Sequence, residues 1–459
     1  MEIIPASPPE VRSLSCPQVQ DWRTPVAGHH YSLGVISLAL AFLLKCRGSL
    51  RGSTSAIELV GCLLGEENTL PSHTSIRSWL LRVGLYQLTR PLEEAEDWIW
   101  IVDHTVQIGE LKCLIILGLR HSRWLAQEDR TLEYEDVDLI DLVPVRTSTG
   151  EVVNAQLEAA TGRTGVPRAI ISDDGRDLHR GLALFRERHP TVQWLYDIKH
   201  KTANLLKHEL EKDPQWTQFS KLANEAKRHV HQTELAFCNP PQQRGKARYM
   251  SVDTLVAWGL KVLAWLDNPR PTGRELDPQR VEAKLGWLRT YRPALVRWKR
   301  ALDVIEMVET TVRRDGYHAD SERELRQRLG PVDAQEVGGR LSSALLTFVA
   351  EQASKAESHE RLPGSSEVLE SVIGKYKTLQ GESGHSGVTG MLLSIGVVVG
   401  KLTIQGIRRA LEAITGPKLR NWEREQLGPT VQSQRRRAFP QATEGTKPGT
   451  NLLPSSATN

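Results

Sequence analysis

The sequence predicts an α/β protein in which a mixed β-sheet contains a large all-helical insertion and follows an N-terminal helical region. Three patterns support this fold class. Short runs rich in Val, Ile, Leu and Trp, each the length of one strand, lie between residues 98 and 196. Segments with the 3.6-residue period of helices alternate with the later runs. From about residue 214 to 357 the strand-like runs fade and helical patterns dominate.

The composition is that of an ordinary folded chain with local basic groups. Its 459 residues include 39% hydrophobic and 25% charged residues, enough for at least one large core. The net charge of +4 is modest, but arginines gather at residues 408–409 and 435–437. Because salt screens charges beyond roughly 10 Å, local groups matter more for phosphate contact than the total does. A solvated basic face explains these groups equally well.

The cysteines and the N-terminus predict a reducing compartment. The five cysteines form no CxxC pair, which argues against a zinc finger and against a secreted disulfide framework. The N-terminus lacks the basic-then-apolar pattern of a signal peptide. The most apolar run, residues 31–46, is slightly short of a membrane span and is better read as a buried helix. We therefore expect a cytoplasmic protein with no membrane segment.

Residues 1–28 are Pro-rich and predict an irregular arm, whereas residues 29–96 predict a helical domain. After the apolar helix, two shorter helical patterns at residues 54–64 and 73–85 are separated by a turn.

Two arginines, Arg77 and Arg82, lie on the polar side of the second short helix. This arrangement suits a helix-turn-helix, whose second helix enters the major groove of DNA. A plain helical bundle without DNA contact explains the pattern about as well, so both readings stay open.

Residues 97–212 predict the first part of the sheet domain. The expected elements are strands at residues 98–102, 111–119, 137–145, 168–172 and 192–196, and helices at about 151–160, 177–188 and 200–210. The first three strands are joined by polar turns and could form an antiparallel meander. An RNase H-like core has this order of three strands, helix, strand, helix, strand and helix.

Three acids mark a candidate site. Asp103 follows the run WIWIV at or near the end of the first strand, and Asp173 directly continues the strand AIIS. Glu370 belongs to a helix that begins near residues 363–365, in the last part of the core at residues 361–425. Carboxylates converging from separate elements are the ligands that hard divalent ions require. Two such ions, Mg²⁺ with Mn²⁺ as a substitute, cleave phosphodiesters by activating water and neutralising the leaving oxygen.

Each of these choices has a rival. Asp174 and Asp177 compete with Asp173, but they suit the start of the next helix, where the dipole favours acids. Glu367 competes with Glu370. Glu370 is preferred because Lys377 lies two helical turns further on the same face and could grip DNA. Any one of these acids could equally be a solvated surface residue.

The remaining segments predict supporting parts. Residues 213–360 predict an all-helical insertion whose tryptophans chiefly fill its own core; the alternative is that one of them stacks on an unpaired base. His200 follows Asp197 after the last core strand and could orient water or meet a phosphate, or could be a hydrogen-bonded helix-cap histidine. Residues 426–459 predict a basic tail without regular structure.

The segments VDHT, ISDDGRDL and SSEVLESVIGKYK resemble the acid triad of bacterial DDE insertion-sequence transposases. The spacing E-x6-K resembles the end of their Y-x2-R-x3-E-x6-K signature. The sequence departs from that signature at position 366, which is serine instead of arginine, and at position 363, which is proline instead of tyrosine. The resemblance covers about residues 97 to 420.

The resemblance implies a fold, an activity and a set of partners. Asp103, Asp173 and Glu370 would be the catalytic metal ligands, and Lys377 and the nearby Lys375 would contact DNA. The activity would be hydrolysis at the ends of a mobile element, followed by attack of the freed 3′-hydroxyl on target DNA. The protein would work on double-stranded DNA at the nucleoid, as a homodimer or higher assembly. Two alternatives are a catalytically silent DNA-binding descendant and an RNase H-like nuclease without strand transfer.

Overall fold

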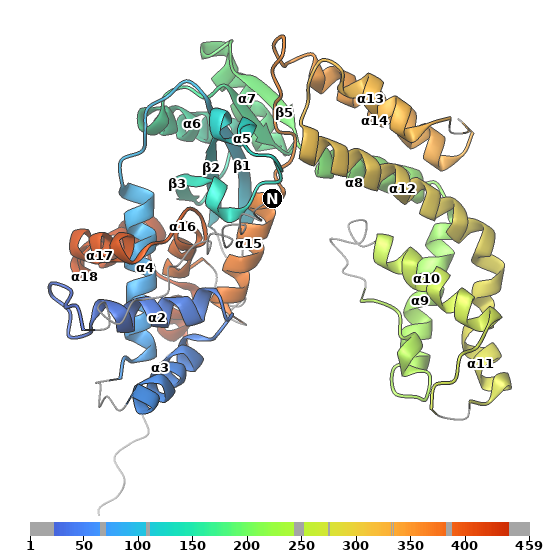
Figure 1. Ribbon diagram of the computed structural model, residues 1–459, viewed down its shortest axis with the longest axis horizontal. Helices are drawn as coiled ribbons and strands as arrows, with labels where there is room; N and C mark the ends of the chain where they lie inside the picture. The colour runs from blue at the N-terminus through green and yellow to red at the C-terminus, as the bar shows by residue number, and fades with distance from the viewer. Residues whose placement is uncertain are drawn as a thin grey trace, which may run out of the picture.

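A computed structural model describes residues 23–64, 70–106, 111–242, 252–273, 276–331, 333, 335–381 and 388–439. Most of the predicted arm, at residues 1–22, and the end of the predicted tail, at residues 440–459, lie outside the described residues. The described chain is a mixed α/β protein with one five-stranded sheet and many helices (Figure 1). The predicted fold class is confirmed at this level.

The sheet has the strand order β3-β2-β1-β4-β5. β1, β2 and β3 pair antiparallel as a meander, and β4 and β5 extend the sheet parallel to β1. The predicted succession of strands and helices along residues 97–212 is confirmed, although a short helix and a 3-10 turn also separate β2 from β3. These elements are β1 (Trp98–Val106), β2 (Lys112–Arg120), α5 (His121–Leu125), η1 (Tyr134–Asp136), β3 (Asp138–Val145), α6 (Gly150–Thr164), β4 (Ala169–Ser172), α7 (Arg176–Arg188), β5 (Gln193–Tyr196) and α8 (Ile198–Glu211).

Both faces of the sheet are covered, which explains why β1 reads as a continuous apolar run. Successive side chains of a strand point to opposite faces. Trp98, Trp100 and Val102 pack in one apolar cluster with residues of α6 and α7, whereas Ile99 and Ile101 belong to the larger core on the other face. All five side chains are buried. The acid that follows this run is therefore carried by a rigid strand.

The N-terminal and C-terminal helices share a core on the second face of the sheet. Helix α4 packs on α2, α3, α16, α17 and α18, and also on β3. A Cβ on Gly84 of α4 would lie 1.9 Å from the carbonyl oxygen of Leu393, so the two backbones approach as closely as glycine permits. The helices are α2 (Leu33–Leu44), α3 (Leu50–Leu64), α4 (His73–Thr89), η6 (Gly390–Leu393), α16 (Ser394–Val398), α17 (Ile404–Ala413), α18 (Gly416–Trp422), η7 (Glu423–Leu427) and α19 (Val431–Ala438).

This packing favours one of the two readings left open for the short helices, the plain helical bundle. Of residues 72–89, only Ser72, His73, Thr74 and Thr89 are exposed, because neighbouring helices surround α4 along most of its length. A recognition helix must present a side-chain face to the major groove. Helix α4 has few fully exposed residues, so the alternative reading of a plain helical bundle describes it better.

The region predicted as an insertion is helical throughout its described parts. In Figure 1 the helices of this region extend away from the sheet, and the long helix α12 runs among them. Trp216, Trp258 and Trp298 are buried, and each ring lies against Phe219, which confirms the expected core role of the tryptophans. The elements are α9 (Pro214–Val230), η2 (Ala236–Cys238), α10 (Val252–Asp267), α11 (Pro278–Leu285), η4 (Gly286–Tyr291), α12 (Arg292–Asp315), α13 (Ser321–Leu329) and α14 (Val337–Ala353).

The end of this region is fastened to the sheet just before the third acid. The backbone N–H of Tyr196 donates to Gln352 Oε1 at 3.1 Å, and Lys355 Nζ donates to the Trp194 carbonyl at 2.6 Å. Tyr317 and Leu362 exchange two backbone hydrogen bonds of 2.7 and 2.9 Å. These contacts fix the segment that leads into α15 (Glu367–Gln380), which packs on β1.

The C-terminal end of the described chain differs from the prediction. Residues 431–438 of the predicted irregular tail form α19, where the Thr430 side chain caps the helix by accepting from the Ser433 N–H at 3.1 Å. None of the described helices combines the length and the apolar character needed to cross a membrane.

Candidate active site

Three aspartates stand side by side at one edge of the sheet. Val102 of β1 pairs with Ser172 of β4, and Ser172 pairs with Tyr196 of β5. The residues that follow these three are Asp103, Asp173 and Asp197. Because the three strands are parallel and in register, the aspartates leave the sheet at neighbouring points.

The place of Asp103 differs from the prediction in one respect. Strand β1 continues to Val106, because β2 pairs with it along this whole stretch. Asp103 therefore lies within the strand, at the first position where β1 no longer has β4 beside it. Its backbone is held on one side by Ile115 of β2, and its other side is free to meet the acids beyond β4 and β5.

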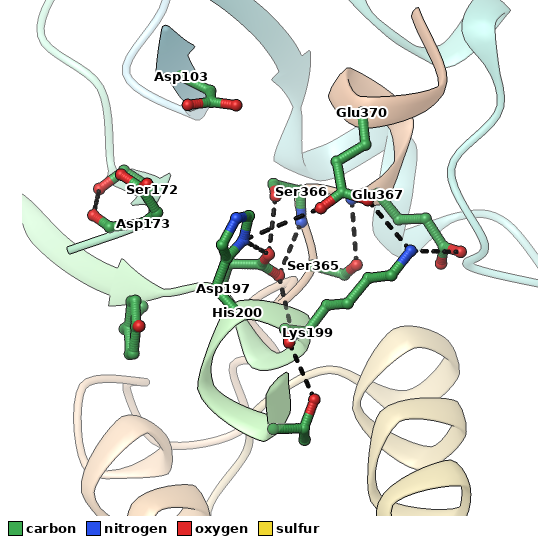
Figure 2. Close-up of polar contacts among 12 residues, drawn as sticks. Asp103, Ser172, Asp173, Asp197, Lys199, His200, Ser365, Ser366, Glu367 and Glu370 are labelled. Carbon is green, nitrogen blue, oxygen red and sulfur yellow. Dashed lines mark hydrogen bonds and ion pairs between the residues drawn. The ribbon is translucent and has the colours of Figure 1, made fainter. Parts of the chain in front are cut away.

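Glu370 reaches the same region from helix α15 (Figure 2). Figure 2 shows Asp103, Asp173 and Glu370 arriving from three separate elements, with Asp197 and His200 between them. Burial, together with the negative charges of Asp173 and Glu370, raises the pKa of Asp103 to about 7. The structure thus brings the three predicted acids into one electrostatic neighbourhood.

Asp197 is a functional candidate that the sequence prediction did not select. Its side chain is 0% exposed. Its carboxylate accepts hydrogen bonds from His200 Nδ1 at 2.7 Å, from the Ser366 hydroxyl at 2.9 Å and N–H at 3.1 Å, and from the Lys199 N–H at 3.3 Å. One buried carboxylate therefore ties the end of β5 and the start of α8 to the start of α15. The signal for it was in the sequence, since Asp197 follows an apolar strand as Asp173 does.

His200 carries a positive charge among these acids. Its hydrogen bond to Asp197 raises the pKa of His200 to about 9, with Glu370 and Asp173 adding to the rise. The ring is therefore protonated at neutral pH, and its Nδ1 lies 3.9 Å from Glu370 Oε1. Although burial raises the pKa of Asp197, the bonds from His200 and Ser366 hold it below the ordinary value. Asp197 and His200 form a charged pair at the N-terminus of α8.

The two glutamates of α15 have different surroundings. Glu367 Oε2 lies 3.1 Å from Arg313 Nη1 of α12, and its other oxygen lies 3.6 Å from Lys199 Nζ. Glu370 Oε2 lies 3.1 Å from Lys199 Nζ. Glu370 is close enough to Asp103 and His200 to shift the pKa of each. Glu367 faces α12, and Glu370 faces the aspartates.

Asp174 and Asp177, the two alternatives to Asp173, have partners outside the site. Asp174 lies on the surface and pairs with His179 Nδ1 at 2.6 Å. Asp177 accepts from the Ser148 hydroxyl and lies 3.8 Å from His104 Nδ1. Asp173 accepts the Gly175 N–H at 3.2 Å. That bond shapes the turn into α7, where Asp173 remains next to Asp103.

Four other predicted site residues lie away from the acids. Lys377 is exposed near the end of α15. Lys375 is half-buried, with its ammonium 4.9 Å from the centre of the Tyr134 ring. Arg77 lies 3.4 Å from Glu423 Oε1. The Arg82 guanidinium donates to the carbonyls of Leu411 and Ile414.

These contacts correct the interpretation of Arg82. The guanidinium also lies 2.8 Å from His29 Nε2, so its nitrogens are occupied within the protein. It satisfies carbonyl groups at the end of α17 that have no partner within that helix. Arg82 is therefore a structural residue here, whereas Lys377 is exposed.

The oxygen donors of the site suit magnesium or manganese. The ligand atoms of Asp197, His200 and Glu370 lie within 4.8 Å of one another, but His200 would have to lose its proton and Asp197 some of its hydrogen bonds before this set could hold an ion. The carboxylates of Asp103, Asp173 and Glu370 are spread more widely, and this set does not meet that limit among the described residues. Burial is the main cause of the raised pKa of Asp103, and the charges of Asp173 and Glu370 add to it. Hard divalent cations bind such carboxylates and relieve their repulsion.

The raised pKa of Asp103 predicts a pH-dependent stability change in Asp103→Asn. With a folded pKa of about 7 against an ordinary value of 3.8, ionisation of Asp103 opposes folding. The cost is absent below about pH 4, grows up to pH 7 and then stays constant. In EDTA at pH 8, we expect Asp103→Asn to raise the free energy of unfolding by about 2–4 kcal/mol.

Urea unfolding at pH 4 and pH 8 measures this difference. At pH 4 the variant and the original protein should agree within about 1 kcal/mol. Asp174→Asn replaces a neighbouring exposed carboxylate and should change stability by less than about 0.5 kcal/mol at either pH. An equal effect of Asp103→Asn at both pH values would contradict the assigned pKa.

Comparisons with known proteins identify no family for the chain. No protein-family model matches it, and no curated protein matches it with statistical significance. Among solved structures, it is similar to a chain of the Drosophila P element transposase strand transfer complex. The TM-score is 0.38 and the sequence identity 11%, over 83% of this chain and 92% of that chain.

Proposed function

We propose that this protein is a DDE-type DNA transposase with an RNase H-like catalytic core. The observation that carries the proposal is the meeting of Asp103, Asp173 and Glu370 from β1, the β4–α7 turn and α15. The raised pKa of Asp103 results mainly from burial, and the negative charges of Asp173 and Glu370 add to it. The three acids are therefore close enough to affect one another. Three separately carried acids around one space are the arrangement that two-metal phosphodiester chemistry needs.

The sheet supports the choice of core. Three antiparallel strands followed by two parallel ones, in the order β3-β2-β1-β4-β5, suit an RNase H-like domain. In this proposal the first acid lies on the central strand β1 and the second at the end of the adjacent β4. The helices of residues 213–360 interrupt the domain before α15 adds the third acid.

The proposed chemistry assigns different work to the residues. Bound Mg²⁺ or Mn²⁺ ions would activate the attacking water or 3′-hydroxyl and neutralise the leaving oxygen. Asp103, Asp173 and Glu370 would hold these ions through their carboxylate oxygens. Asp197 would act on Glu370 indirectly, by fixing the start of α15 through Ser366.

The positively charged residues would bind the DNA. Protonated His200 lies beside the acids and would meet a phosphate of the scissile strand. The exposed Lys377 would bind the DNA backbone two helical turns beyond Glu370. We propose that double-stranded DNA is the partner. A dimer or larger assembly would bring the two ends of an element together.

A strand-transfer assay tests the proposal. The full-length protein would receive labelled DNA containing the sequences that flank its own gene, with a supercoiled plasmid as target and Mg²⁺ or Mn²⁺. The proposal predicts a nick at the element end and covalent joining of the label to the plasmid. Nicking without joining would indicate a nuclease. DNA binding without nicking in either metal would indicate a catalytically silent DNA-binding protein.

A further inference from the structure

Lys199 forms an ion pair with Glu370, the third acid of the site. Its ammonium lies 3.1 Å from Glu370 Oε2 and 3.6 Å from Glu367 Oε1, and Figure 2 shows it reaching up from the start of α8 to both glutamates. The Lys199 side chain is 32% exposed and that of Glu370 is 26% exposed. Partial burial strengthens an ion pair relative to one in water. Glu370 is therefore neutralised by a cation of the protein itself.

This contact conflicts with the role of Glu370 as a metal ligand. An ammonium and a divalent ion on the same carboxylate would repel each other at short range. Lys199 must therefore leave Glu370 before Glu370 can contribute a full negative charge to an ion. Lys199 and the ion compete for one ligand.

The surroundings give Lys199 a second place to go. Glu367 is fixed by Arg313 of α12, with 3.1 Å between Arg313 Nη1 and Glu367 Oε2, so its other oxygen can keep the ammonium. A cavity of about 660 Å³ beside them is lined by Lys199, Glu367 and the half-buried α12 acid Glu309, among other residues. Lys199 can thus move away from Glu370 without losing every acidic partner.

We propose that Lys199 is a displaceable cation, which pairs with both Glu370 and Glu367 in the metal-free protein and keeps only Glu367 when a divalent ion binds. Binding of a divalent ion to Glu370 is then an exchange of one cation for another. This inference rests on the proposed function, because it takes Glu370 as a ligand. In this proposal Lys199 controls the affinity of the site for metal, and Glu367 binds the Lys199 ammonium while the ion is present.

Manganese binding to the full-length protein without DNA tests the exchange, using the electron paramagnetic resonance signal of free Mn²⁺. Lys199→Met should bind Mn²⁺ about tenfold more tightly than the original protein, because the competing charge is gone. Lys207→Met is the matched control. It removes one lysine charge from the same helix, where Lys207 pairs with Glu211 at 3.9 Å, and should leave the affinity within about twofold.

A second substitution separates competition from a general charge effect. Glu367→Gln removes the alternative partner of Lys199, and should weaken Mn²⁺ binding about threefold or more because the ammonium then has only Glu370. Adding Lys199→Met to Glu367→Gln should restore tight binding. If the original protein binds Mn²⁺ and Lys199→Met binds it no more tightly, the exchange is wrong while the metal site stands. If neither protein binds Mn²⁺, the metal site itself is wrong.

Discussion

Asp103→Asn, Asp173→Asn and Glu370→Gln are each expected to lower the rate of DNA nicking by at least about 10³-fold, with DNA binding retained. Each change keeps the size of the side chain and removes one negative charge from the set of three. Since the proposed ions need all three carboxylates, loss of any one should remove the activation of the nucleophile. Single-turnover nicking of end-labelled DNA at saturating Mg²⁺ measures the effect.

The neighbouring acids provide matched controls. Asp174→Asn and Glu367→Gln remove the same charge within three positions of Asp173 and Glu370. Asp174 pairs with His179 on the surface, and Glu367 is held by Arg313, so each should change the nicking rate by less than about tenfold at saturating metal. If either control fell by 10³-fold and its neighbour did not, the wrong acid would have been assigned.

Asp197→Ala should be the most destabilising of the substitutions considered. It would leave the charged His200 without its closest partner and free the hydroxyl and N–H of Ser366. Removing one member of a buried, hydrogen-bonded pair costs about 3–5 kcal/mol. Because α15 would lose its tie to β5 and α8, the nicking rate should also fall by about 10²-fold, a loss that follows from misplacing Glu370.

Urea unfolding and nicking at a temperature where both proteins are folded separate the two effects. Asp303→Ala is the control, since Asp303 is a half-exposed acid of α12 paired with Lys299. It should change stability by less than about 1 kcal/mol and leave nicking unchanged. A stable Asp197→Ala protein with the original nicking rate would show that Asp197 has no positioning role.

The succession of strands along the chain was predictable because each strand carries its own signal. The runs that became β1, β4 and β5 are apolar and short, and each ends at an aspartate. Burial on both faces explains such runs in β1 and β4, whereas only Leu195 of β5 is buried. Asp103 and Asp173 could be chosen for the same reason. The length of β1 was not predictable, because the residues after Asp103 are held in the strand by pairing with β2.

The roles of Arg82 and Asp197 were not predictable, because they depend on contacts between segments far apart in the chain. Arg82 has the position of a surface residue on a short helical pattern, yet Leu411 and Ile414 accept its hydrogen bonds. Only the C-terminal helices packed around α4 reveal that role. Asp197 stands next to the predicted His200, but its importance depends on Ser366, which is 169 positions away in the chain.

One measurement tests the central claim most directly: nicking of a labelled element end by the full-length protein in Mg²⁺, Mn²⁺ and EDTA, with Glu370→Gln in parallel. The proposed site predicts a nick at the element end in either metal, none in EDTA and none with Glu370→Gln. Equal nicking by Glu370→Gln, or nicking that persists in EDTA, would contradict a metal site formed by Asp103, Asp173 and Glu370.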